Sequence, residues 1–369
     1  MRRSRALISL ASLTTLALMV AGCSSTSTSD ADAASEEGAI TVTDQRGQEV
    51  TVQGPVESIA SAVIPAPAII AAVDGSWDRI TGINQSLLDA NQQGIIGKIF
   101  PESLETPVIS GPDFIPNMEE VLAADPDVVV QWGDMGDEVL QPIEQAGLPV
   151  VGLEYGTQED LETWIDLFGD MIGKPERADE ILNWMHEEAE AVSGQVEDLD
   201  LESPRGLSTS YSERAISVDT SSDYAQHVFD TAGITNVAKD APVTDGVASA
   251  EQIIEWDPEI IFLSAFDPAV PEDVYNDPRL SEVTAVKDKR VYRAPLGVYR
   301  WQVPSAESPL YWNWVAALAY PGEFEVDLPA EMREQTAFLY NYDLTDEDID
   351  LELRTDINDG SANYDVVAQ

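Results

Sequence analysis

Arg300 lies between Tyr299 and Trp301, shortly after the strand predicted by the segment RVYRAP. A guanidinium group donates forked hydrogen bonds to anionic groups, and neighbouring aromatic rings add cation–π and stacking contacts. This triplet therefore suits an anionic, partly aromatic small molecule. The alternative is an ion pair between Arg300 and one of the many neighbouring acids, and both interpretations remain open from the sequence.

Two further aromatic residues, Trp132 and Tyr211, stand at the ends of predicted strands. A small molecule could stack on such rings, although an aromatic residue at a strand end belongs to the core equally often. In open α/β sheets ligands bind beyond the carboxyl ends of the strands. We therefore expect the ligand-contacting residues on the loops 61–67, 84–88, 111–114, 132–135, 211–214, 265–267 and 297–301.

Other features argue against an enzyme. The chain has no G-x-S-x-G, H-E-x-x-H, P-loop or dinucleotide motif, and its 68 acidic residues make paired carboxylates uninformative. A single cysteine, Cys23, and two distant histidines, His186 and His227, disfavour a site for a bare transition metal. We predict no catalytic residue, no metal ligand and no resident cofactor. A secreted carbohydrate-active enzyme is the alternative from another functional class.

A basic cluster flanks the predicted strand of RVYRAP. Charged side chains on an edge strand usually face water, so we expect this cluster to be solvated. Its members are Lys287, Lys289, Arg290 and Arg293.

The formal net charge of the 369-residue chain is -49. Such a surface repels nucleic acids and anionic lipids, so we expect no nucleic-acid partner. It also suggests a solvated extracellular or high-salt setting.

Short β-branched segments alternate with helical or turn-like segments through most of the chain, which predicts an α/β fold. We expect an N-terminal α/β lobe at 39–157, connecting helices at 158–202, a C-terminal α/β lobe at 203–322 and a helical extension at 323–369. The N-terminal lobe should begin with a β-hairpin around Gly47. The expected strands are ITVTD, EVTVQ, VESIASAVI, RITGIN, PDVVVQW, LPVVGLE, GLSTSYS, AISVDT, EIIFLSA and RVYRAP.

The longest expected helix connects the two lobes. Pro175 is a favourable first-turn residue, and apolar residues then recur at three- and four-residue steps. A helix over 175–198 would be about 36 Å long. It would hold the two lobes at a nearly fixed separation.

One pattern occurs twice, in NMEEVLAADPDVVV at 117–130 and SAEQIIEWDPEIIF at 249–262. Glu119 and Glu251 each lie seven positions before a proline, Pro126 or Pro258. Each segment predicts a short helix that the proline ends, followed by a buried strand. An acid in the first turn of a helix contributes about 0.3–1 kcal/mol, which accounts for the paired glutamates only in part.

The first 22 residues have a basic start followed by an apolar stretch and small residues, as in a secretory signal peptide. VAGC at 20–23 resembles the lipobox of bacterial lipoproteins, in which Cys23 would be lipidated. The following residues, 23–38, are polar and predict a disordered tether.

The order of these features resembles the substrate-binding lipoproteins of ABC importers for iron–siderophore complexes, haem and vitamin B12, which are class III periplasmic binding proteins. The resemblance spans nearly all of the mature chain. It implies two Rossmann-like α/β lobes joined by one long helix, with the ligand in the cleft between them. The segments that carry it are VTDQRGQEVTVQGPVESIAS, NMEEVLAADPDVVV, FDTAGITNVA, SAEQIIEWDPEIIF and LSEVTAVKDKRVYRAPLG.

The resemblance also implies partners. Glu119 and Glu251 would dock into arginines of the two permease subunits, one acid on each lobe. The receptor would be a monomer, lipid-anchored to the outer face of the cell membrane, and would deliver a ferric siderophore-type chelate. The ligand contacts we expect are Arg300, Trp301, Tyr299, Tyr211 and Trp132.

The aromatic C-terminal part is similar to a branch of this family that also binds molybdate or tungstate. These oxyanions, haem and cobalamin are therefore alternative ligands. A signalling or cell-wall interaction protein on the same fold is a further alternative.

Overall fold

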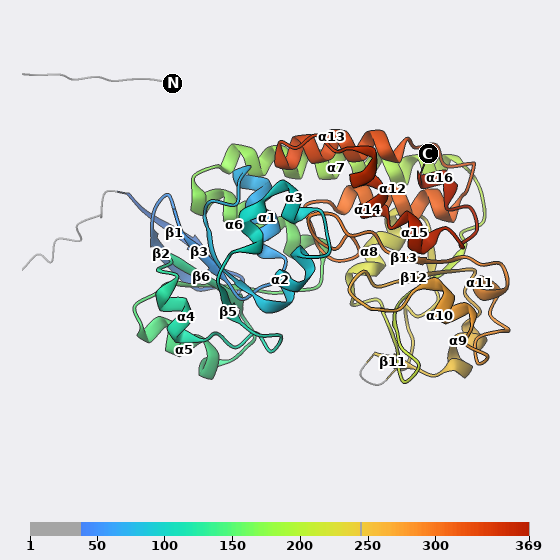
Figure 1. Ribbon diagram of the computed structural model, residues 1–369, viewed down its shortest axis with the longest axis horizontal. Coiled ribbons are helices and arrows are strands. Elements are labelled where there is room, and N and C mark those ends of the chain that lie inside the picture. Colours follow the sequence, from blue (N-terminus) through green and yellow to red (C-terminus); the bar gives the residue numbers. More distant parts are fainter. Residues whose placement is uncertain (1–37, 244–245, 369) are drawn as a thin grey trace, which may run out of the picture. The chain divides into compact units, whose positions relative to one another are not determined.

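The structure, a computed structural model, describes residues 38–243 and 246–368 (Figure 1). The predicted signal peptide, Cys23 and all but the last residue of the predicted tether lie outside the described residues. No described helix is long and apolar enough to cross a membrane.

The N-terminal half contains a five-stranded parallel sheet in the order β5-β4-β3-β6-β7. The hairpin of β1 (Ala39–Thr43) and β2 (Glu49–Gln53) precedes it, and Gly47 takes a positive φ of 73° in the turn, as predicted. The strands are β3 (Ile59–Ser61), β4 (Ile80–Asn84), β5 (Val108–Ser110), β6 (Val128–Trp132) and β7 (Val150–Leu153). The helices are α1 (Ala66–Asp74), α2 (Gln85–Asn91), α3 (Ile96–Ile99), α4 (Met118–Ala123) and α5 (Asp137–Gln145), with a 3-10 turn at Pro101–Leu104.

The C-terminal half repeats this strand order as β11-β9-β8-β12-β13, with β10 also paired to β8. Strands β8, β12 and β13 are parallel, whereas β9 and β11 run antiparallel to their neighbours. The strands are β8 (Arg205–Tyr211), β9 (Ile216–Val218), β10 (Thr235–Asn236), β11 (Val247–Ala248), β12 (Ile260–Leu263) and β13 (Val291–Arg293). The helices are α8 (Tyr224–Thr231), α9 (Ala250–Trp256), α10 (Pro271–Tyr275) and α11 (Thr284–Lys287).

The twin segments form corresponding elements. Helix α4 leads into β6 and α9 leads into β12, and each of these strands lies beside the central strand of its sheet, β3 or β8. Asp125 and Asp257, the residues before the two prolines, both take positive φ, 47° and 42°. The acids after the prolines accept backbone N–H groups: Asp127 from Ser58 and Glu259 from Arg205. The Asp-Pro-acid pattern therefore has a structural role in connecting each short helix to the strand that follows it.

Helix α7 covers Pro175–Asp198, and this confirms the predicted connecting helix. It packs against α1 and α6 (Gln158–Ile172) of the first half and against α8 and α12 (Ser308–Ala319) of the second. Helix α13 (Leu328–Tyr340) lies beside α7 (Figure 1), where Arg177 donates to the Phe338 carbonyl oxygen. The chain ends with α14 (Asp346–Leu353), α15 (Thr355–Asn358) and α16 (Asp365–Ala368).

One continuous apolar core extends through both halves. It runs from the first sheet (Val130) through Trp164 and Met185 of α6 and α7 to Phe262 and Tyr292 of the second sheet. Two smaller clusters fill the opposite faces of the two sheets. The long helices are therefore part of the core of both sheets.

Candidate functional site

A cavity of about 670 Å³ lies between the two halves. Its lining comes mainly from segments at the carboxyl ends of the parallel strands of the first sheet, as expected for this fold. The segment after β13 closes it from the other half. The lining residues are Ile64, Pro65, Phe114, Trp132, Asp134, Met135, Glu154, Tyr155, Tyr299 and Arg300.

A second, smaller cavity of about 190 Å³ adjoins the first and shares Tyr155 and Arg300 with it. Apart from Tyr155, its lining belongs to the C-terminal half: Ser208, Thr209, Asp219, Asp223, Tyr224, Ala225, Ser264, Arg300, Gln302 and Val303. We call the two cavities together the cleft, and the smaller one the small compartment.

Aromatic rings build one wall of the cleft. The ring centroid of Trp132 lies 6.2 Å from that of Phe114 and 5.6 Å from that of Tyr155, both edge-on. Behind it, the buried Trp164 lies 6.0 Å away and donates its indole N–H to Gln45 Oε1. Trp132 is only half-buried, so it offers a ring surface on a rigid support to a bound molecule.

Arg300 provides the positive charge of the cleft wall. Its guanidinium carbon lies 4.1 Å from the ring centroid of Phe266 and 5.2 Å from that of Tyr299. Its Nη2 donates to the Tyr299 hydroxyl at 2.8 Å, and its buried Nε has no hydrogen-bond partner among the described residues. The predicted alternative, an ion pair with an acid, is not what holds Arg300; two aromatic rings hold it, and it retains donors for a ligand.

Two buried carboxylates, Glu307 and Glu352, interact electrostatically near the segment that carries Arg300, and Glu307 supports that segment directly. Glu307 accepts the backbone N–H groups of Val298 and Tyr299 at 3.2 and 3.0 Å. A Cβ on Gly297 would lie 2.4 Å from Glu307 Oε1, so only glycine fits there. Glu352 of α14 is fully buried, and neither of its oxygens has a hydrogen-bond partner in the described part of the chain. Burial raises the pKa of both carboxyls, and the charge of Glu307 raises the pKa of Glu352 further.

The structure does not bring all the predicted contacts together. Arg300, Tyr299 and Trp132 line the cleft, but Trp301 is fully buried and points into the core behind Gly297. The prediction of Trp301 as a ligand contact is therefore not supported, because its indole is packed in the apolar core beside Gly297.

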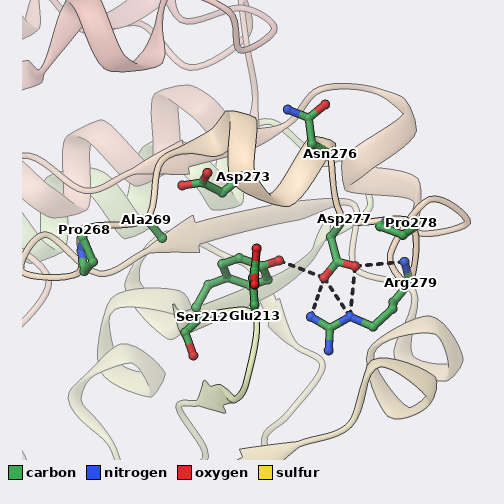
Figure 2. A pocket seen from close by; sticks show the side chains of 10 residues that line it. Ser212, Glu213, Pro268, Ala269, Asp273, Asn276, Asp277, Pro278 and Arg279 are labelled. Atoms are coloured by element: carbon green, nitrogen blue, oxygen red, sulfur yellow. Dashed lines mark hydrogen bonds and ion pairs between the residues drawn. The ribbon is translucent and has the colours of Figure 1, made fainter.

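Tyr211 lines a different pocket of about 650 Å³ in the C-terminal half (Figure 2). Its hydroxyl donates to Asp277 at 2.8 Å, and Arg279 donates to the same carboxylate through its backbone N–H, Nε and Nη2. Figure 2 shows Arg279 folded onto Asp277. The hydrogen bonds from Arg279 lower the pKa of Asp277, and burial raises that of Tyr211 to about 12. This network holds Tyr211 away from the cleft.

The predicted basic cluster is only partly solvated. Lys287 and Lys289 are exposed, but Arg290 donates to the carbonyl oxygens of Leu318 and Ala319. Arg293 donates to the carbonyl oxygen of Ala265. The prediction was wrong for both arginines because α10 and α15 pack against β13 and the end of α12 accepts from Arg290, so that this edge strand is not open to water along its length.

Glu119 and Glu251 are both exposed, and each is the second residue of its helix, α4 or α9. Asn117 and Ser249 cap the two helices through their side chains. Neither glutamate lines the cleft. Figure 1 shows α4 and α9 on the side of the molecule opposite α7.

Sequence analysis missed Glu154 and Tyr155, although Glu154 is the last residue of the predicted strand LPVVGLE and Tyr155 follows it directly. Phe114, Asp134 and Phe266 lie on loops that were expected to reach the ligand. Their position on a loop after a strand indicated that they could line the cleft, but the sequence pattern does not tell which side chain points into it.

The chain resembles known binding proteins along most of its length. A family model described as "Periplasmic binding protein" matches residues 68–296. The molybdate-binding protein MolA of Haemophilus influenzae is 25% identical over 311 residues, covering 78% of this chain and 84% of that protein. The Fe(3+)-citrate-binding protein YfmC of Bacillus subtilis is 24% identical over 294 residues, covering 79% and 90%.

The fold is also similar to that of solved binding proteins. The crystal structure of a periplasmic solute binding protein from Veillonella parvula superimposes with a TM-score of 0.77 at 33% identity, covering 87% of this chain and 98% of that one. These similarities exclude the carbohydrate-active enzyme considered above. The chain therefore belongs to the periplasmic binding protein family, the non-enzymatic, extracytoplasmic solute-binding proteins of ABC transporters.

Proposed function

We propose that the protein binds a ferric siderophore-type chelate in the cleft and delivers it to the permease of an ABC importer. The observation that carries the proposal is the single guanidinium of Arg300, held on aromatic rings, facing a wall of Phe114, Trp132 and Tyr155. The negatively charged oxygen donors of a chelate suit the guanidinium, and its organic backbone suits the rings.

Size and charge disfavour the oxyanion alternative. A cavity of about 670 Å³ is in the range that binds drug-sized ligands. Molybdate or tungstate is only a few times larger than a water molecule, which takes about 30 Å³, and would fill a small part of it. A dianion also needs several hydrogen-bond donors, whereas Asp134 and Glu154 line the same cavity. Haem and cobalamin remain the alternative ligands of larger size.

Tryptophan fluorescence can test the ligand class, because Trp132 lines the cleft. We expect a ferric chelate to change the emission and molybdate, tungstate, haem and cobalamin to leave it unchanged. Arg300→Gln should weaken chelate binding by about 10- to 100-fold, the loss expected for hydrogen bonds to a charged group. Arg279→Gln, at the other pocket, is the matched control. A response to molybdate alone would establish the oxyanion alternative instead.

We further propose that Glu119 and Glu251 contact the two permease subunits. Their exposure, their equivalent positions on α4 and α9, and the fact that neither lines the cleft support this role. Lipidation of Cys23 would keep the protein at the outer face of the cell membrane, within reach of that permease.

A further inference from the structure

The small compartment differs from the rest of the cleft in its polar chemistry. Three of its hydroxyl groups donate to other protein groups: Ser208 to Asp219, Thr209 to the carbonyl oxygen of Ser217, and Tyr224 to Gln158 Oε1. The amide Nε2 of Gln302 donates to Ser264 Oγ at 3.1 Å. Most donors that face this cavity are therefore already used.

Acceptors remain. The Asp219 carboxylate receives one hydrogen bond, from Ser208, on Oδ2. Asp223 receives its hydrogen bonds from Thr220 on Oδ2, and it is exposed. The buried Oε1 of Gln302 has no hydrogen-bond partner in the described part of the chain. An acceptor withdrawn from water without a donor costs about 1–3 kcal/mol, which a donor from a ligand would recover.

The charges in the small compartment also favour a hydrogen-bond donor. Two carboxylates, Asp219 and Asp223, face one guanidinium, Arg300, in a cavity of about 190 Å³. Burial raises the pKa of Asp219, as expected for a carboxylate that is desolvated without an adjacent cation. Arg300 can balance only one of these two carboxylate charges. The compartment therefore favours a donor and disfavours an oxyanion, which is an acceptor only.

We propose that the small compartment binds a positively charged, hydrogen-bond-donating arm of the ligand, such as a primary ammonium group on a short chain. This inference rests on the proposed function: the metal chelate occupies the larger cavity against Trp132 and Arg300, and its arm passes Tyr155 to reach Asp219, Asp223 and Gln302. The ligand class is thus a ferric chelate that carries an ammonium group, rather than a uniformly anionic one.

A matched pair of ligands tests the proposal. One is a ferric trihydroxamate with a terminal primary ammonium group, and the other is the same chelate after acetylation of that amine. We expect the ammonium form to bind at least about tenfold more tightly to the wild-type protein. Asp223→Asn, at an exposed position, should remove most of this preference, measured as the ratio of the affinities for the two chelates.

Asp219→Asn should act in the same direction, and thermal melting checks that this variant is folded. Asp134→Asn, in the larger cavity, is the control and should keep the preference. Equal binding of the two chelates by the wild-type protein would overturn the inference while leaving the proposed function intact. Binding of neither chelate would overturn the proposed function, and the inference with it.

Discussion

The proton held by Glu352 makes the stability of the protein depend on pH. The carboxyl is fully buried beside Glu307, and the charges of Glu307 and Asp348 both oppose its ionisation. Tyr340 of α13, also buried and with an unpartnered hydroxyl among the described residues, is the other titratable group close to the pair. Glu352 therefore keeps its proton in the folded protein well above its ordinary pKa of 4.5.

The direction in which the free energy of unfolding changes with pH follows from proton binding. Above the ordinary pKa of Glu352 and below its raised pKa in the folded protein, the folded protein holds this proton and the unfolded chain does not, so the free energy of unfolding falls as pH rises. One proton corresponds to at most about 1.4 kcal/mol per pH unit. Glu352→Gln removes the titrating group. The difference in unfolding free energy between variant and wild type should therefore increase as pH rises through this range.

Urea unfolding at half-unit pH steps measures this difference. Glu347→Gln, an exposed position on the same helix, is the matched control and should follow the wild-type pH profile. A Glu352→Gln profile parallel to that of the wild type would refute the inferred proton. Glu307→Ala, in contrast, leaves the N–H groups of Val298 and Tyr299 without their acceptor and should weaken ligand binding at every pH.

Three further outcomes are expected. Charge reversal of both Glu119 and Glu251 to Lys should nearly abolish uptake by facing like charges across the interface, with melting temperature and ligand affinity almost unchanged. Normal uptake would mean that the two glutamates only stabilise the first turns of their helices. Cys23→Ala should be released or remain unprocessed, and its recovery at mature size in the detergent-phase membrane fraction would contradict lipid anchoring. Because α7 packs on both halves, ligand binding should change the radius of gyration only slightly in solution scattering, and a large decrease would contradict a rigid connection.

Much of the fold was predictable because its signals are local. Pro175 and the apolar repeat after it predicted α7 with the bounds that the structure has. The Asp-Pro steps at 125–126 and 257–258 predicted both helix ends, since proline cannot continue a helix. The positive φ of the two aspartates adds a reason that sequence analysis did not give.

The site was less predictable because it depends on contacts between distant segments. Tyr299 lines the cleft and Trp301 does not, and the difference depends on the turn that Glu307 holds. Tyr211 is drawn to another pocket by Asp277, 66 positions away in the sequence. The match to the family ends at residue 296, just before the segment that carries Arg300. The cleft residues Tyr299 and Arg300 thus lie beyond the part of the chain that the family model matches.

The shared core around α6 and α7 has a consequence for how the molecule unfolds. Side chains of both sheets are buried in one cluster, so neither half can lose its packing without exposing apolar surface of the other. The two halves should therefore melt in a single cooperative transition, and neither should fold when expressed alone. Exposed cleft residues that are outside this cluster, such as Asp134 and Glu154, can change without that penalty. A chain built this way can acquire a new ligand through its loops while its thermal tolerance stays the same.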